Sequence, residues 1–391
     1  MKIWDYLEMT SEAFRTNYLE TRLVDVATHD EFPLQMLTYG REAVHTNNWD
    51  VVIRKCRGII FNIETGEIVA RPFFKFFNLG TAGMPETNPS NWEFDGNTTM
   101  GAPEVWEKMD GFLATMYEYK DRQYIASKGS FHSTHAKWAT AWYRENVKGV
   151  WPEGYTPVFE GICSSLRIVV GYEYEGLVLL ALVNNETGEE LNTESLQVWA
   201  KKNGVITPVR FHLDWKEARV KSMDPATKNV EGYVLVWRRP GQTPFRLKVK
   251  YVDYLRLHRM VSGVSAKAIY NCLAGNEYKS DLDEWCNEST PWFSKFVNKW
   301  VRALTLRHDE LMGDATRIFA FTQEKLKQVS LDNWDKPAVV RKAYAEAFAQ
   351  WPDVKGILFA MFDGKDATAV AWKLVKPMIK GSQPMLDVSK M

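Results

Sequence analysis

Cysteine is scarce in this sequence, and neither sign of charge is in excess. The cysteines are scattered and form no Cys-x-x-Cys pair: Cys56, Cys163, Cys272 and Cys286. This spacing indicates neither a zinc cluster nor the disulfide framework of a small secreted protein. Lys plus Arg and Asp plus Glu each total 49 residues. The overall charge therefore carries no nucleic-acid signature, and any basic surface must be local.

Long apolar runs are missing as well. The N-terminal segment MKIWDYLEMTSEAF carries charges throughout, where a secretory signal would have an apolar core. No later segment reaches the roughly 20 consecutive apolar residues of a membrane-spanning helix. We therefore expect a soluble protein of the reducing cytoplasm with no membrane partner. With 391 residues, 45% of them hydrophobic, the chain is long enough for two domains.

Short β-rich runs broken by turns fill residues 51–255. The apolar and β-branched residues of VVIRKCRGIIFNI, GLVLLALV and FRLKVKYV are typical of strands. Residues 132–147 and 192–203 have helical spacing and are predicted to pack on the sheets. An antiparallel α+β core is therefore expected in this part of the chain.

Helical patterns replace the strands after residue 256. Thr290-Pro291 is typical of a helix start, because threonine is a good N-cap and proline is favoured at the first helical position. Residues 336–351 have an amphipathic helical pattern, and Asp366 is a candidate N-cap of a last helix. We therefore predict an α+β domain at residues 1–255 and an all-helical domain at residues 256–391.

The tetrapeptide Lys108-Met109-Asp110-Gly111 lies between two strand-like segments. Alone it is a weak signal, because a solvated lysine beside an Asp-Gly turn is the ordinary interpretation. Alternation along a later strand places Lys248 and Lys250 on one face. Four more motifs follow the tetrapeptide in order: Ser127-Lys128-Gly129-Ser130, Phe159-Glu160-Gly161, Glu231-Gly232-Tyr233-Val234 and Leu247-Lys248-Val249-Lys250. The functional hypothesis rests on this order.

Taken together, the five motifs resemble the nucleotidyltransferase motifs of the covalent ligase and capping-enzyme superfamily. Two upstream segments, 56–61 (CRGIIF) and 71–78 (RPFFKFFN), are similar to the N-terminal signature of the bacteriophage T4 RNA ligase 1 family. The resemblance implies an ATP-grasp-like nucleotidyltransferase fold in which two antiparallel sheets hold ATP between them. It also implies an ATP-dependent RNA ligase that forms phosphodiester bonds.

The resemblance further implies roles for the motif residues. Lys108 is expected to attack the α-phosphate of ATP and to carry AMP, with Asp110 orienting it. A lysine at its reference pKa of about 10.4 is protonated and not nucleophilic. Surrounding cations are expected to lower this pKa and to neutralise the triphosphate. These cations are Arg57, Lys75, Lys248 and Lys250.

The remaining motif residues are assigned to the nucleotide and to a metal ion by the same resemblance. Glu160 is expected to accept the ribose hydroxyls, Lys128 to contact a phosphate, and Glu107 to belong to the nucleotide site. Glu231 and Asp110 are expected to hold Mg²⁺, or Mn²⁺ in its place, near the α-phosphate.

The implied partner is RNA with a 5′-phosphate and a 3′-hydroxyl end. In the phage family such ends arise in tRNA broken in the anticodon loop, and the helical domain contributes to tRNA preference. We therefore expect a monomeric enzyme of tRNA repair, in the host cytoplasm if its gene is a phage gene.

Several alternatives stay open. A capping-type guanylyltransferase or a DNA ligase also carries Lys-x-Asp-Gly, although both normally continue into a β-rich OB domain where this chain becomes helical. A noncatalytic RNA-binding relative would keep the fold without the reaction. His132 and His135 have HxxH spacing on a helix face, but no third ligand accompanies them, which favours the absence of a metal there.

Overall fold

The computed structural model describes residues 1–88, 101–166, 168–275, 279–287 and 291–380. The chain forms two compact units, Met1–His258 and Arg259–Lys390. The division falls inside helix α8 (Val252–Gly263). The change of pattern near residue 255 lies in the same helix.

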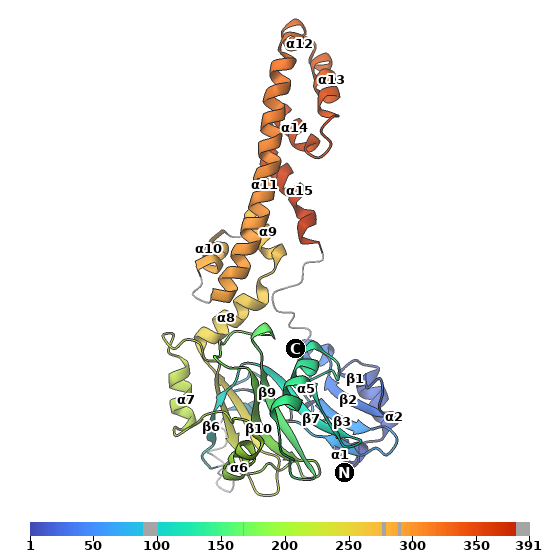
Figure 1. Ribbon diagram of the computed structural model, residues 1–391, viewed down its shortest axis with the longest axis vertical. Coiled ribbons are helices and arrows are strands. Elements are labelled where there is room, and N and C mark those ends of the chain that lie inside the picture. Colours follow the sequence, from blue (N-terminus) through green and yellow to red (C-terminus); the bar gives the residue numbers. More distant parts are fainter. Residues whose placement is uncertain (89–100, 167, 276–278, 288–290, 381–391) are drawn as a thin grey trace. The chain divides into compact units, whose positions relative to one another are not determined.

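Three β-sheets build the first unit (Figure 1). The N-terminal sheet consists, in spatial order, of β1 (Val24–Thr28), β2 (Leu34–Tyr39), β3 (Arg57–Asn62) and β4 (Ile68–Ala70). The middle sheet consists of β10 (Gly176–Asn184), β9 (Tyr155–Ile162), β7 (Phe112–Tyr119) and β8 (Arg122–Ser127). The five-stranded sheet consists of β11 (Arg210–Phe211), β6 (Glu104–Lys108), β12 (Gly232–Trp237), β13 (Phe245–Lys250) and β5 (Phe77–Asn78).

The α+β class with antiparallel sheets is confirmed, with two differences in detail. The short strand β5 pairs in parallel with β13. The N-terminal sheet is additional to the two sheets expected, because β1 and β2 precede residue 51, where the strand-like pattern begins. Strand β1 exposes Asp25, Val26 and Thr28, so it lacks the apolar alternation that reveals a half-buried strand.

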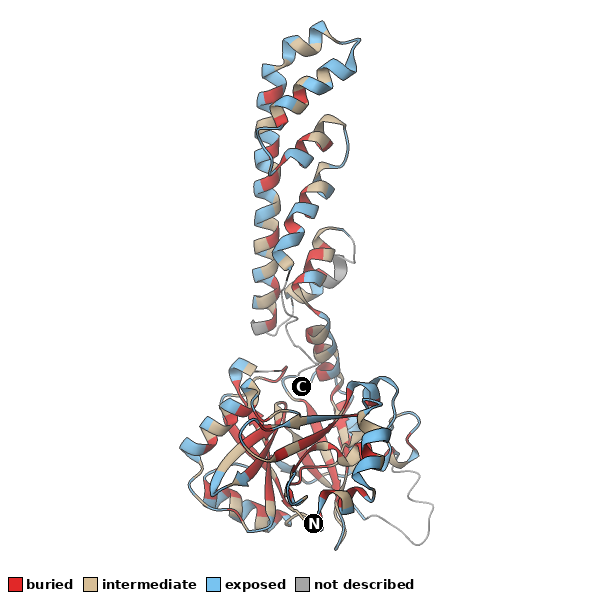
Figure 2. Cartoon of the chain, turned by 90° about the vertical axis from the view of Figure 1, so that its right-hand side faces the viewer, coloured by how far each residue is buried: buried red, intermediate tan, exposed pale blue. Residues whose placement is uncertain are grey.

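Helices cover the middle sheet. Both predicted helices are confirmed as α5 (Thr134–Asn146) and α6 (Thr193–Asn203). Tyr143 of α5 and Leu196 of α6 belong to one core with Phe159. A second core joins the N-terminal sheet to the middle sheet; it contains Leu34, Met36, Ile60, Tyr117 and Ala126. Figure 2 shows buried residues concentrated along the strands of this unit.

The remaining helices of the first unit are short. They are α1 (Ile3–Leu7), α2 (Ser11–Phe14), α3 (Arg41–His45), α4 (Val51–Lys55) and α7 (Trp215–Ser222). A π-helical turn occupies Arg15–Leu19, and 3-10 turns occupy Pro85–Thr87 and Ser164–Leu166.

The second unit is helical in the part that the structure describes. Its longest helix, α11 (Pro291–Lys325), runs alongside shorter helices (Figure 1). These are α9 (Ala266–Leu273), α10 (Lys279–Asn287), α12 (Lys327–Asp332), α13 (Pro337–Phe348), α14 (Lys355–Phe362) and α15 (Ala367–Val375), followed by a 3-10 turn at Lys376–Ile379. Asp366 caps α15 as predicted, since its side chain accepts a hydrogen bond from N of Ala369. Thr290, the other predicted cap, lies outside the described residues.

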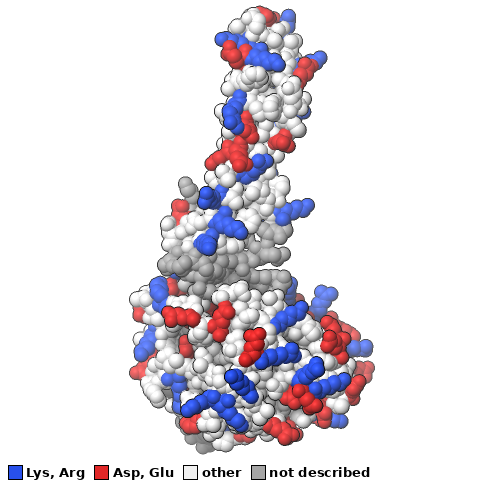
Figure 3. Space-filling view, viewed as in Figure 1, with Lys and Arg blue, Asp and Glu red and all other residues white. Residues whose placement is uncertain are grey.

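Surface charge and the apolar character of the helices are two further properties that relate to function. In Figure 3, acidic and basic side chains are interspersed on the visible face of each unit, in keeping with the zero net charge. Among the helices described, none is both long enough and apolar enough to cross a membrane.

Candidate active site

Strand register brings the motif lysines together. Strand β12 lies between β6 and β13, and Gly232 pairs with Lys108 on one side and with Lys250 on the other. Glu231 directly precedes Gly232, so it lies at the same end of the sheet as both lysines. A Cβ atom at Gly232 would lie 2.0 Å from the carbonyl oxygen of Val249, which makes glycine necessary there.

Glu231 forms ion pairs with two lysines. Its Oε2 lies 2.9 Å from Nζ of Lys108, and its Oε1 lies 2.9 Å from Nζ of Lys250. The Glu231 side chain is only 3% exposed, and burial alone would raise its pKa. The two lysines outweigh burial and lower the pKa of Glu231. A buried carboxylate is thus held in its charged form between two ammonium groups.

The pKa of Lys108 is raised, which corrects the expectation that neighbouring cations depress it. Burial disfavours the charged amine, but Glu231 and Glu160 favour it and prevail. The reason is the register, which puts a carboxylate in direct contact with the Lys108 amine. In this structure Lys108 is an ammonium group, and it must lose a proton before it can act as a nucleophile.

Lys248 carries the strongly depressed pKa instead. Burial and several nearby cations hold it well below its usual value. Those cations are Lys108, Lys75, Arg57 and Lys250. Arg57, Lys75, Lys128 and Lys248 are called the cation group below, since within the described part of the chain none of them forms an ion pair with a carboxylate. Such a group is suited to bind a polyphosphate.

Tyr39, at the end of β2, joins the cation group although no motif pointed to it. Its hydroxyl accepts a hydrogen bond from Nζ of Lys128 at 3.4 Å. Burial raises the pKa of this phenol, but Lys75, Lys128 and Arg57 outweigh burial and lower it to about 8. Tyr39 belongs to the N-terminal sheet, whose first strands the sequence pattern did not reveal.

Glu160 approaches Lys108 from strand β9 of the middle sheet. Its Oε1 accepts a hydrogen bond from N of Gly111 at 3.0 Å. Burial raises the pKa of Glu160 to about 7, although Lys108 opposes the shift. A Cβ atom at Gly111 would lie 2.2 Å from the carbonyl oxygen of Gly161. Glycine at the end of the motif therefore lets β7 and β9 meet beside the lysine.

Asp110 is buried, and three protein donors engage its carboxylate. Its Oδ2 accepts hydrogen bonds from N of Val169 and N of Val170 at 2.8 and 2.7 Å. Its Oδ1 accepts one from the hydroxyl of Tyr254 at 2.8 Å, and its own N donates to the hydroxyl of Tyr172 at 2.8 Å. Asp110 therefore ties the lysine motif to segment 169–172 and to the start of α8.

Glu107 lies apart from the cation group. It is adjacent to Lys108 on β6, so its side chain points to the opposite face of the strand. Its Oε2 accepts a hydrogen bond from N of Val209 at 3.4 Å. Burial is the main cause that raises the pKa values of Tyr172 and Tyr174, and the negative charge of Glu107 adds to the rise in both.

The two histidines of the HxxH motif and the other common metal-binding side chains are dispersed in the described part of the chain. No cluster of three or more His, Cys, Asp or Glu side chains arranged for a metal ion occurs in that part. Nε2 of His132 lies 3.6 Å from Oδ2 of Asp30. The ring of His135 packs against Phe112, with centroids 4.6 Å apart.

A family model described as RNA ligase matches residues 55–254. This chain belongs to the bacteriophage T4 RNA ligase 1 family. The matched range contains all five motifs, from Lys108 to Lys250, so the resemblance inferred from them is confirmed. Because the chain belongs to an RNA ligase family, the RNA ligase interpretation is preferred to a capping enzyme or a DNA ligase.

Relatives extend the similarity beyond the matched range. The RNA ligase of Rhodothermus phage RM378 is 23% identical over 375 residues, 80% of this chain and 81% of the relative. A Thermovibrio ammonificans protein with an RNA ligase name is 26% identical over 279 residues, 68% of this chain and 69% of the relative. Among solved structures, an archaeal ATP-dependent RNA ligase has a TM-score of 0.44 at 13% identity, covering 76% of this chain and 77% of that one.

The site of this ligase contains aromatic residues that motif reasoning missed. Besides Tyr39, Tyr172 and Tyr254 contact Asp110, and the ring centroid of Tyr254 lies 4.8 Å from Nζ of Lys250. Tyr254 follows Lys250 by four residues, so its closeness to the last motif was a usable signal. Tyr172 lies in a loop, and only the folded chain brings it to the lysine motif.

Proposed function

We propose that this RNA ligase consumes ATP and carries AMP on Lys108 while it joins RNA ends. The observation behind the proposal is a partly buried lysine, paired with Glu231 at 2.9 Å, beside the cation group. In the first step the neutral amine of Lys108 bonds to the α-phosphorus of ATP. The bond to the bridging oxygen breaks, and pyrophosphate leaves with the electron pair. The cation group stabilises the charge on this leaving group.

Two further transfers complete the proposed reaction. An oxygen of the RNA 5′-phosphate attacks the phosphorus of the AMP, and the lysine amine leaves. A 3′-hydroxyl then attacks the 5′-phosphorus of the adenylylated RNA, AMP leaves, and the hydroxyl proton passes to solvent. The products are a phosphodiester bond and free AMP.

The first step requires Lys108 to give up the proton that Glu231 stabilises. A divalent cation such as Mg²⁺ would be held by Glu231 and phosphate oxygens, and would supply positive charge that favours the neutral amine. Asp110 has a different part in this proposal, because its carboxylate already accepts three hydrogen bonds. It positions the lysine motif against Tyr254.

Glu160 and Lys128 complete the proposed nucleotide site. Glu160 is anchored on N of Gly111 beside Lys108, where a carboxylate suits the ribose hydroxyls as acceptor. Lys128 belongs to the cation group and would contact a phosphate. Glu107, on the other face of β6, is left out of the nucleotide site.

RNA with a 5′-phosphate and a 3′-hydroxyl is the proposed substrate, and broken tRNA its preferred form. The motifs all lie before residue 251, whereas the helical unit holds a small excess of basic residues. We assign the choice of RNA to this unit, because phosphate contacts by Lys and Arg supply much of the affinity for nucleic acids.

Nucleotide choice tests the proposal directly. Incubation with Mg²⁺ and α-labelled ATP is expected to label the protein covalently, whereas α-labelled GTP is not, because the chain is a ligase and not a capping enzyme. Peptide mapping should place the label on Lys108. A label obtained from GTP alone would contradict the assignment.

Removal of the helical unit tests the assignment of RNA choice. A chain ending at His258 is expected to keep self-adenylylation but to lose its preference for nicked tRNA over a plain oligonucleotide of equal length. The measurement is the ratio of joining rates for the two substrates, after circular dichroism has verified folding. An unchanged ratio would place the discrimination in the first unit.

A further inference from the structure

The cations of strand β13 are held in place by different partners. Arg246, Lys248 and Lys250 lie on one face of the strand. Arg246 forms an ion pair with Glu190, and Lys250 forms one with Glu231. Lys248 forms none within the described residues; its Nζ lies 4.6 Å from the ring centroid of Phe76. The face of an aromatic ring therefore contacts this ammonium group where a carboxylate contacts the other two cations.

Lys75 repeats this arrangement with more rings. Its Nζ lies 5.2 Å from the ring centroid of Tyr39, 5.0 Å from that of Trp49 and 5.4 Å from that of Phe77. The other two members of the cation group follow the same pattern. Nζ of Lys128 lies 4.6 Å from the Tyr39 centroid, and the guanidinium carbon of Arg57 lies 5.6 Å from the Phe76 centroid. Every member of the cation group thus has an aromatic partner.

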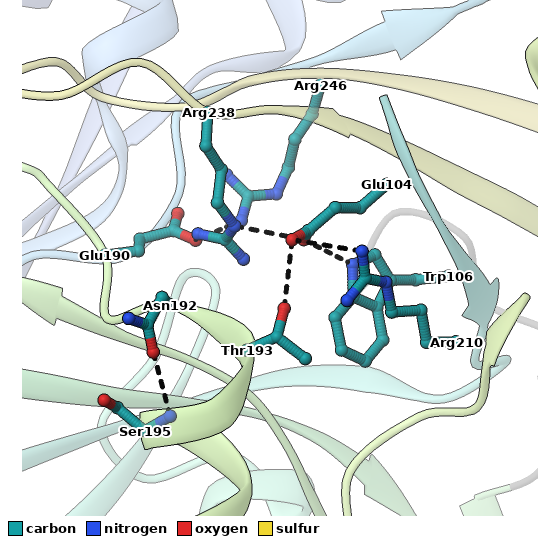
Figure 4. Close-up of polar contacts among 9 residues, drawn as sticks. All are labelled: Glu104, Trp106, Glu190, Asn192, Thr193, Ser195, Arg210, Arg238 and Arg246. Carbon is teal, nitrogen blue, oxygen red and sulfur yellow. Dashed lines mark hydrogen bonds and ion pairs between the residues drawn. The ribbon is translucent and has the colours of Figure 1, made fainter. Parts of the chain in front are cut away.

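In a second cluster of the same unit, the cations have carboxylates as partners. Figure 4 shows Arg238 between Glu190 and Glu104, with Arg246 beside Glu190 and Arg210 beside Glu104. Here carboxylates neutralise the arginines, as is usual for buried charges. Arg246 also lies over a ring, 4.2 Å from the Phe73 centroid. It therefore has both kinds of partner, whereas Lys248 has a ring but no carboxylate among the residues that the structure describes.

A carboxylate partner and an aromatic partner of a cation have different consequences for the binding of an anionic ligand. A carboxylate neutralises a cation, but a phosphate must then displace it. An aromatic face attracts a cation by about 0.5–2 kcal/mol through its quadrupole, and it brings no net negative charge. A ring can therefore hold an ammonium group in position while leaving its full charge available to a phosphate.

We propose that Phe76, together with Phe77, Tyr39 and Trp49, positions the cation group for the polyphosphate of ATP through cation–π contacts. This inference rests on the proposed use of ATP by the same site. It gives the aromatic run of segment 71–78 a purpose beyond packing. Phe76 is the ring to test, because it faces both Lys248 and Arg57 and, unlike Tyr39, has no hydroxyl that also contacts a cation.

The test measures binding of Mg-ATP and of inorganic pyrophosphate to the full-length chain by isothermal titration calorimetry. Phenylalanine analogues with one, two and five ring fluorines replace Phe76, since fluorine weakens the ring quadrupole while nearly conserving shape. Affinity is expected to fall stepwise with each fluorine. Phe76→Leu, which removes the ring, should weaken binding about tenfold, equivalent to ~1.4 kcal/mol, and Phe76→Tyr should restore it.

Phe73 supplies the matched control, because it lies in the same segment and also faces a cation. Arg246 keeps Glu190 as a partner, so fluorination of Phe73 should leave the affinity unchanged. A flat series at Phe76, or equal losses at Phe73 and Phe76, would overturn the inference while leaving the proposed function intact. Failure of the wild type to bind either ligand would overturn the proposed function and the inference with it.

Discussion

Lys108→Ala is expected to abolish ATP-dependent joining of RNA and yet to seal RNA whose 5′-end already carries AMP. The lysine amine is the proposed nucleophile toward ATP, but it has no covalent role once AMP is attached to RNA. Joining with ATP should fall below about one thousandth of the wild-type rate. Sealing of adenylylated RNA should stay detectable, since Glu231, Lys248 and Lys250 remain to orient the ends.

Both reactions are measured by gel analysis of a labelled RNA, with Lys137→Ala as the control. Lys137 is an exposed residue of α5, so its loss should change neither reaction. Sealing with ATP by the Lys108→Ala variant would show that Lys108 is not the nucleophile and that another residue carries AMP. A wild type that makes no adenylylated intermediate would favour a noncatalytic RNA-binding protein.

Lys248→Met is expected to impair nucleotide transfer and to stabilise the fold at the same time. Loss of a cation facing the phosphates should slow self-adenylylation about 100-fold. Burial and neighbouring cations hold the pKa of Lys248 well below its usual value, so its charge destabilises the folded state. Methionine removes that cost, and the melting temperature should rise by about 2–4 °C, the effect of ~1 kcal/mol in a domain of this size.

The pH dependence of this gain has a definite sign. Below the folded pKa of Lys248, both the folded and the unfolded chain carry its proton, and the destabilisation is fully present. Between that pKa and the unfolded value of about 10.4, unfolding takes up a proton, so the wild type becomes more stable as pH rises. The advantage of Lys248→Met should therefore be largest below the folded pKa of Lys248, decline as pH rises, and vanish near pH 10.4.

Lys250→Met is the contrasting variant for thermal unfolding. Lys250 pairs with buried Glu231, so its removal takes a counterion from a buried carboxylate and should not stabilise the protein. It should still impair nucleotide transfer. Equal stability changes in the two variants, or transfer at the wild-type rate in Lys248→Met, would contradict the separation between a ring-held and a carboxylate-held lysine.

The sequence by itself determined the family, the α+β class and most of the residues that lie near Lys108. Motif order predicted Lys108, Glu160, Glu231 and Lys250 as site residues, because the proposed chemistry restricts residue types at short, recognisable spacings. Strand alternation placed Lys248 and Lys250 on one face, since it depends only on neighbouring residues. Helical spacing likewise located α5 and α6.

Only the tertiary structure decided how these residues act on one another. The pairing of Gly232 with both Lys108 and Lys250 puts Glu231 between two lysines, and this reverses the expected direction of the pKa shift of Lys108. Tyr39 reaches the cation group from a sheet that local pattern did not reveal. Charges and rings act over a few ångströms, and strand register between distant segments sets those distances; local periodicity carries no information about that register.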